Sequence, residues 1–186
     1  MKKEFKPTNA MYPLPAVLVT TCDANGRDNI ITIAWTTNIS RENSCVAVSI
    51  GGNKLSLRNI RETKDFVINI PGTELLEKVD FCGENHGDDI DKFDKAKLTR
   101  QVASMVKSKL IDECPINLEC KLVDIYEINS AYLVVGKIVK VHIDDSILDE
   151  NEKIDYIKLN PIVYANKTYF GIREELAKRG FSKNKI

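Results

Sequence analysis

The sequence carries a glycine turn that leads into a helix start. Residues 51–56 read Gly-Gly-Asn-Lys-Leu-Ser and follow a β-branched run, Val46–Ile50. Glycine lets a backbone approach a ligand closely, and the first turn of a helix offers unpaired N–H groups and a positive dipole end. Lys54 adds a charge and Ser56 a hydroxyl, with Asn59 behind them. The turn therefore indicates a phosphate site; the alternative is a plain strand-to-helix connection with an exposed lysine.

A second polar segment precedes this turn. The run Asn29–Ser40 begins with β-branched residues and continues through Trp35, Thr36 and Thr37. Aromatic side chains favour both flat ligands and buried contacts, so Trp35 is either a ligand contact or a residue of the core or of a dimer interface. Neither G-x-x-x-x-G-K-[ST] nor G-x-G-x-x-G occurs. Together the two segments can hold a phosphorylated planar ligand.

Short strands must position these segments. Ala16–Thr21 and Asn29–Trp35 flank an Asn25-Gly26 turn, which predicts a hairpin. Two further strands are expected at Cys45–Ile50 and Asp65–Ile70.

Helices are expected to be few and short. The apolar spacing predicts one over Lys54–Thr63, and we expect Thr73 to cap a second that runs through Val79. Residues 84–113 are charged and lack an apolar period, which favours short helices and a long loop.

The last third of the sequence predicts an extended ribbon. Ile116–Ile128 and Tyr132–Ile143 read as long strands joined at Asn129-Ser130, of the kind on which a small barrel closes. Tyr156–Tyr169 is expected to return as one or two short strands, and the charged tail Glu174–Ile186 as a short helix with a frayed end. The fold class predicted is mainly β with short helices (α+β).

Composition limits the partners. The 186 residues favour a single domain over 1–186, with a core at about residues 10–172. With 27 basic and 27 acidic residues, we expect no nucleic acid and no membrane as partner. The N-terminus lacks an apolar signal region, and no apolar run approaches the length of a membrane span, so a cytoplasmic protein is expected.

Metal and hydrolase chemistry have little support. Five cysteines without C-x-x-C spacing favour reduced thiols, and the spacing of Cys114 and Cys120 is unusual for a zinc site completed by His86 or His142. The acidic run Asp88–Asp94 lacks the glycine and the glutamate of a calcium loop. No nucleophile elbow or H-E-x-x-H pattern is present. We expect no bound metal.

An ordered set of short segments resembles the flavin reductase-like family of FMN-binding split barrels, and most closely its flavoredoxin branch. These segments span roughly residues 10 to 172 in the order of the family. Besides the runs above they are Pro13–Thr21, Asn59–Thr63, Phe66–Pro71, Cys82-Gly83, Asp91–Phe93, Glu113–Pro115, Leu118–Cys120, Val135–Ile138 and Leu159–Tyr164.

The resemblance implies an FMN-binding split β-barrel and assigns roles to residues. Lys92 lies in the Asp-Lys-Phe signature, where the family lysine contributes to the flavin site; from its spacing alone it is only a surface lysine. Relatives carry a histidine near Ala131 and Tyr132, so this contact differs here. The cofactor-binding residues expected are Asn29, Trp35, Thr36, Thr37, Ser49, Asn53, Lys54, Ser56, Asn59, Lys92 and Tyr164.

Three functions follow as hypotheses. One is an NAD(P)H-dependent flavin reductase, an FMN oxidoreductase that takes hydride from NADH or NADPH. The second is a flavoredoxin-like carrier that exchanges electrons with a redox protein partner and has no NAD(P)H site of its own. The third is a non-redox ligand-binding barrel. The resemblance also implies a homodimer.

Overall fold

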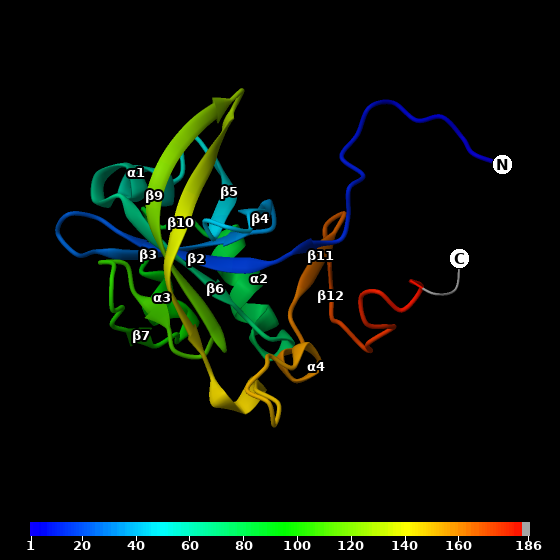
Figure 1. Ribbon diagram of the computed structural model, residues 1–186. Helices are drawn as coiled ribbons and strands as arrows, with labels where there is room; N and C mark the ends of the chain where they lie inside the picture. The colour runs from blue at the N-terminus through cyan, green and yellow to red at the C-terminus, as the bar shows by residue number, and fades with distance from the viewer. Residues whose placement is uncertain (184–186) are drawn as a thin grey trace.

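A curled seven-stranded sheet forms the body of the molecule (Figure 1). The computed structural model describes residues 1–183. All neighbouring strands in this sheet are antiparallel, in the order β3-β2-β6-β9-β10-β5-β4. Their bounds are β2 Val17–Cys22, β3 Asp28–Ile33, β4 Thr36–Ser40, β5 Cys45–Gly51, β6 Asp65–Ile70, β9 Ile116–Ile128 and β10 Ala131–Ile143.

The two edge strands of this sheet are consecutive in the sequence. Only Ala34 and Trp35 separate β3 from β4, so the sheet must curl until its two edges approach each other. The Ser49 N–H donates to the Trp35 carbonyl at 2.8 Å, which holds this crossing point against β5. The expected strand Asn29–Trp35 therefore ends earlier, at Ile33, and the polar segment after it forms the edge strand β4.

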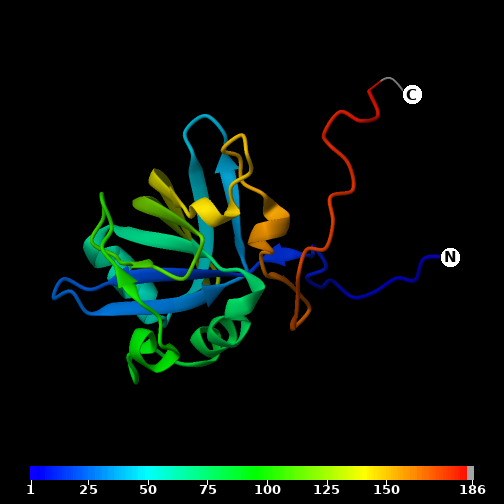
Figure 2. The same ribbon diagram turned by 90° about the horizontal axis from the view of Figure 1, so that it is seen from below.

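Strand β2 separates two apolar clusters. Val17 and Val19 point to one side, where they join Phe66 and the helix α1 (Leu55–Thr63) inside the curled sheet. Ala16 and Leu18 point to the other side, where α2 (Leu76–Glu84) and α3 (Lys92–Ala96) cover the sheet. This alternation follows from the two-residue period of a strand. Strand β3 is thus an edge with α1 on one face and α2 and α3 on the other, as Figure 2 shows from below.

Smaller elements complete the fold. Three strands pair as β1-β11-β12, which ties the segment before β2 to the end of the chain. Both termini project from the body on the side of this small sheet (Figures 1 and 2). The bounds are β1 Leu14–Pro15, β7 Arg100–Gln101, β8 Leu110–Ile111, β11 Val163–Ala165 and β12 Thr168–Phe170, with 3-10 turns η1 Thr73–Leu75 and η2 Asp145–Ile147 and helix α4 Tyr156–Leu159.

Three expected elements differ in the structure. Thr73 does not cap the second helix: it opens η1, its hydroxyl accepts a bond from the Asn160 amide, and α2 extends to Glu84. Tyr156–Leu159 is a helical turn rather than strand, because the Asp155 carboxylate accepts two N–H groups at its start. The tail has no helix within residues 171–183, and its last three residues lie outside the described part.

No helix within residues 1–183 combines the length and apolar character needed to cross a membrane. The five cysteines are all free.

Candidate functional site

A narrow polar recess lies at the start of α1, beside the edge of β3. Lys54 and the first turn of α1 form one wall, and the loop between α2 and α3 forms the other. The lining residues are Asn29, Ile31, Lys54, Leu55, Ser56, Gly83, Asn85, His86, Gly87, Asp88 and Lys92. Four residues that the sequence analysis placed in a cofactor site therefore meet here: Asn29, Lys54, Ser56 and Lys92.

The wall at α1 presents an uncapped helix N-terminus. Lys54 is the N-cap residue, no described side chain caps the helix, and its first turn holds no acidic residue. Ser56 lies buried in this first turn, and its hydroxyl accepts a 2.8 Å bond from the Asn29 side-chain amide of β3. An uncapped N-terminus with a hydroxyl and a lysine is suited to an anion.

The opposite wall passes very close to β3. A Cβ atom on Gly87 would lie 1.9 Å from the Asn29 side-chain oxygen, so only glycine fits at this point of the loop. The Arg27 guanidinium holds this loop by donating to the Gly87 carbonyl at 2.8 Å. Residues 85–88 could not be predicted from the sequence, since a charged segment without apolar period carries no signal of this approach.

Lys92 is buried at the base of the recess, with 3% of its surface exposed. Its ammonium donates to the Cys82 carbonyl at 2.7 Å, and it forms no ion pair within residues 1–183. Burial lowers the pKa of Lys92 to about 8; the Cys82 thiol opposes this shift, and the positive charge of Lys54 adds to it. The alternative of a surface lysine is therefore wrong. A buried cation without a carboxylate partner is costly unless an anion joins it.

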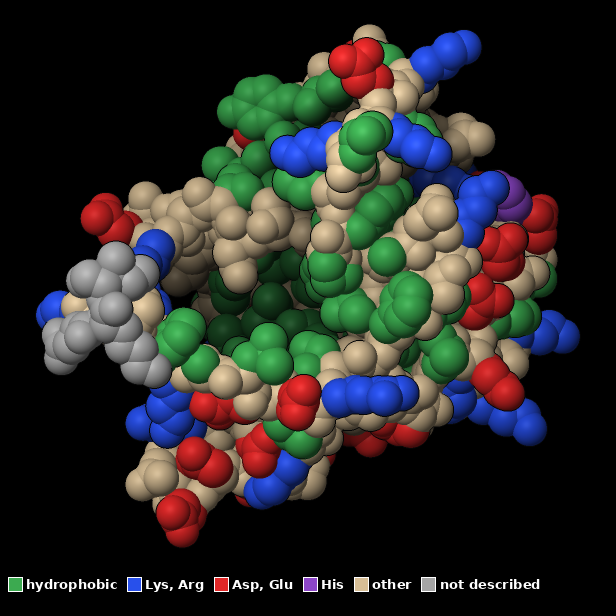
Figure 3. Space-filling view, turned by 90° about the vertical axis from the view of Figure 1, so that its right-hand side faces the viewer, with side chains coloured by type: hydrophobic (Ala, Val, Ile, Leu, Met, Phe, Trp, Pro, Cys, Tyr) green, Lys and Arg blue, Asp and Glu red, His purple; other side chains and the backbone are tan. Residues whose placement is uncertain are grey.

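An open, largely apolar cavity of about 740 Å³ lies beyond the other end of β3. Hydrophobic side chains form the floor of the hollow on the molecular face seen in Figure 3. The N-terminal arm closes one side, which the sequence analysis had not predicted. The cavity is lined by residues 8–15, Trp35, Thr36, Thr37, Ala47, Ser49 and Leu133.

Trp35 lies at this cavity with half of its surface exposed. The alternative of a core residue is therefore wrong, whereas a ligand contact and a dimer contact both fit. The Thr36 hydroxyl donates to the Ala47 carbonyl at 2.8 Å, and the Thr37 hydroxyl to the Asn38 carbonyl at 3.3 Å. Each hydroxyl keeps acceptor capacity for a polar ligand edge.

Two chain segments join the recess to the cavity. Asn29 lines the recess and Trp35 lines the cavity, and the six residues of extended chain from one to the other span about 20 Å. Ser49 and Lys54 make the same link across the glycine turn. The arrangement suits an elongated ligand with an anionic end and a flat apolar end.

Three expected site residues lie outside both places. Asn59 is buried and donates to the Thr21 hydroxyl at 3.2 Å. Asn53 is exposed, and its carbonyl accepts from Arg58. Tyr164 packs edge to face between Tyr12 and Tyr169, with ring centroids 6.4 and 5.6 Å away.

Tyr132 packs against the glycine turn that precedes α1. A Cβ atom on Gly52 would lie 2.9 Å from the Tyr132 ring, so the glycine turn passes directly against this tyrosine. The Arg61 guanidinium covers the ring at 4.6 Å from its centroid. Tyr132 therefore supports the turn from behind.

Sequence comparison decides the family. The profile described as "Flavin reductase like domain" matches residues 9–173. The chain belongs to the flavin reductase-like family. Uncharacterised relatives include a protein of Aquifex aeolicus, 28% identical over 86% of this chain and 84% of its own length, and one of Archaeoglobus fulgidus, 32% identical over 78% and 81%.

Solved structures agree with this family. The flavoredoxin of Desulfovibrio vulgaris superposes with a TM-score of 0.94 at 30% identity, over 99% of this chain and all of that one. A flavoredoxin from Methanosarcina acetivorans gives 0.89 at 22% identity, over 99% of both chains. A structure from Shewanella frigidimarina, described as having a split barrel domain, gives 0.81 at 20% identity over 89% and 85%. The predicted family and the mainly β split-barrel fold are confirmed.

Proposed function

We propose that this flavin reductase-like protein binds FMN and acts as an oxidoreductase. The phosphate occupies the polar recess, and the isoalloxazine ring lies in the apolar cavity beside Trp35. The observation that carries this proposal is the buried ammonium of Lys92, which faces Lys54 at an uncapped helix start without an ion-pair partner in the described chain. The flavoredoxin from Desulfovibrio vulgaris, 30% identical, supports it.

FMN, when bound, supplies the redox chemistry, and the protein supplies position and electrostatics. Lys54, Lys92 and the Ser56 hydroxyl neutralise and orient the phosphate. Trp35 and the apolar wall of residues 8–15 exclude water from one side of the ring, and the hydroxyls of Thr36 and Thr37 meet its polar edge.

The cofactor test uses purified protein. Denaturation should release FMN rather than FAD, because two lysines and an uncapped helix start line the recess and suit one terminal phosphate. Apoprotein titrations with FMN and riboflavin locate the phosphate: Lys54→Ala should weaken FMN more than riboflavin, whereas Lys95→Ala, an exposed lysine of α3, should change neither. Protein that neither carries nor binds FMN overturns the proposal.

The electron donor separates two versions of this function. The open cavity has space for a flat donor beside the ring, which favours an NAD(P)H-dependent flavin reductase. The likeness to flavoredoxins favours a carrier that exchanges electrons with a redox protein. Anaerobic mixing with NADH or NADPH bleaches the flavin absorbance only in the first version. If the protein binds no flavin at all, the remaining hypothesis is a non-redox ligand-binding barrel.

We also propose a homodimer of single-domain subunits that span residues 1–186 and work in the cytoplasm. Large apolar side chains remain exposed on β9 and β10, among them Val123, Tyr126, Ile128 and Val141. An apolar face of this kind favours burial against a second copy. Light scattering should give twice the 21.0 kDa subunit mass; a monomer that still holds FMN contradicts this assembly.

A further inference from the structure

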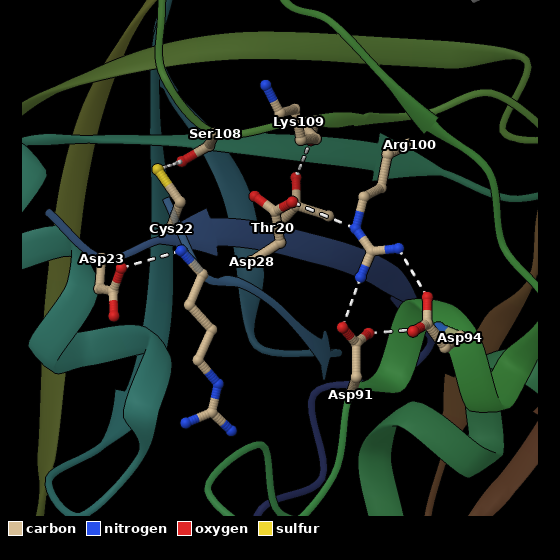
Figure 4. A network of polar contacts seen from close by, with 10 residues as sticks. Thr20, Cys22, Asp23, Asp28, Asp91, Asp94, Arg100, Ser108 and Lys109 are labelled. Atoms are coloured by element: carbon tan, nitrogen blue, oxygen red, sulfur yellow. Dashed lines mark hydrogen bonds and ion pairs between the residues drawn. The ribbon is translucent and has the colours of Figure 1, made fainter. Parts of the chain in front are cut away.

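Arg100 binds three carboxylates behind the polar recess (Figure 4). Its guanidinium pairs with Asp28 at 3.2 Å, Asp91 at 2.6 Å and Asp94 at 2.7 Å. The same group lies over the buried Phe93 ring, 4.5 Å from the centroid. Arginine can make such a contact because its fork of donors is planar and rigid.

Two of these carboxylates adjoin residues of the recess. Asp28 precedes Asn29 on β3, and strand alternation sends their side chains to opposite faces. Asp91 precedes Lys92 and is the N-cap residue of α3, where its carboxylate accepts the Asp94 N–H at 3.2 Å. A single guanidinium therefore ties β3 to the start of α3, and with them the two elements that carry Asn29 and Lys92.

Arg100 also balances the negative charge of the carboxylates that it binds. Arg100 is the shared counterion of Asp28, Asp91 and Asp94. Only 7% of the Asp28 side chain is exposed, and one of its carboxylate oxygens has no hydrogen-bond partner within the described chain. Burial raises the pKa of Asp28, and Arg100 opposes this rise.

We propose that Arg100 is a positioning residue for the phosphate end of the FMN site. It holds β3, which carries Asn29, against the start of α3, which carries Lys92. This inference rests on the proposed FMN function. It concerns a residue that does not line the recess and that acts through Lys92.

The test compares FMN with riboflavin, which lacks the phosphate. Arg100→Met should weaken FMN by about tenfold and riboflavin by less than about twofold, because the contact governs the phosphate end only. Lys95→Met is the control: Lys95 is an exposed cation on α3 that forms no ion pair within residues 1–183, so its loss should change neither affinity. Arg100→Lys should recover only part of the affinity, because an ammonium cannot bridge three carboxylates in this geometry.

A double-mutant cycle tests the route through Lys92. In a Lys92→Met background, Arg100→Met should cost little further FMN affinity. Asp91→Asn keeps a cap oxygen but loses the ion pair, so it should show a smaller loss with the same preference for FMN; it serves as the measurement if Arg100→Met does not fold. Equal losses for both ligands, or losses that add, overturn the positioning role. Wild-type protein that binds no FMN instead overturns the proposed function.

Discussion

Asn29 and Ser56 meet across the edge of β3, where the Asn29 amide donates a 2.8 Å hydrogen bond to the Ser56 hydroxyl. Both side chains are buried. Because the hydroxyl accepts from Asn29, its own proton is free to be donated into the recess. The pair thus presents a fixed donor beside Lys54, at the place proposed for the phosphate.

Removing this hydroxyl should affect stability and binding together. Ser56→Ala leaves the buried Asn29 amide without its acceptor, which should cost about 1–3 kcal/mol of unfolding free energy, and it should weaken FMN more than riboflavin. Urea unfolding of the apoprotein and ligand titration measure the two effects. Ser56→Thr keeps the hydroxyl and should retain most of both; a threonine variant as poor as the alanine variant would contradict the assignment.

Lys92 should lower the stability of the apoprotein and raise its affinity for FMN. Lys92→Met removes a buried charge that lacks an ion-pair partner, so the apoprotein at pH 7 should be at least as stable as wild type. The same variant should bind FMN much more weakly, with a smaller change for riboflavin. Thermal unfolding of apoproteins and paired titrations provide the measurements. A variant that loses stability and keeps its FMN affinity would remove Lys92 from the site.

FMN affinity should depend on alkaline pH. The pKa of Lys92 in the apoprotein is lowered to about 8, mainly by burial, and a bound phosphate favours its charged form. Affinity should therefore be full below about pH 8 and should fall as the pH rises above it. Titrations from pH 7 to pH 10 test this in wild type, with Lys92→Met as the control that should show a flat profile. An unchanged wild-type affinity across this range counts against the contact.

Trp35 provides a signal for the ring end of the ligand. It is the only tryptophan in the sequence and is half exposed in the cavity, so FMN and riboflavin should both quench its fluorescence. Inorganic phosphate should not. Trp35→Phe should weaken FMN and riboflavin alike, the opposite pattern to Lys54→Ala. Quenching by phosphate alone, or a Trp35→Phe variant that affects only FMN, would place the ring elsewhere.

Glu119 should set the acid limit of stability. It is fully buried, and its carboxylate accepts from the Ser104 N–H at 2.8 Å, the Met105 N–H at 2.6 Å and His142 Nε2 at 2.6 Å. Burial raises the pKa of Glu119, but these bonds outweigh burial and leave it below its usual value. A lowered pKa in the folded state stabilises the protein above about pH 4.5, and this contribution is lost as the pH falls through the folded-state value.

The matching variant is Glu119→Gln. It should lower the unfolding free energy at pH 7 by about 1–3 kcal/mol and reduce the further loss between pH 5 and pH 3. Urea unfolding at several pH values tests both statements. An unchanged acid dependence in the variant would assign the acid transition to other carboxylates.

The sequence predicted those parts of the site that depend on neighbouring residues. The glycine turn, the start of α1 and the hairpin of β2 and β3 follow from local turn residues and apolar spacing, and the structure shows each of them. The apolar run at Tyr156 was misread because the cap at Asp155 competes with its strand-like composition. Local propensity does not settle such short segments.

Burial of Lys92 could not be read from its surroundings in the chain. Its carbonyl partner belongs to α2 and its charged neighbour Lys54 is the N-cap residue of α1, and the folded topology alone brings them together. Residues 8–15 and 85–88 were missed for the same reason, since each becomes a wall only when a distant strand lies opposite. The resemblance to the family identified Lys92 where the residue pattern did not.

The strand order also governs when the site can form during synthesis. Most residues of the recess and the cavity leave the ribosome early, because β3, β5, α1 and α3 all precede residue 97. Yet β5 lies between β4 and β10, and β6 lies between β2 and β9. Until Ile143 has left the ribosome, β5 and β6 in the nascent chain therefore lack their neighbours β10 and β9. The proposed cofactor should therefore bind only late in synthesis, and a chain that stops before β9 should hold no flavin.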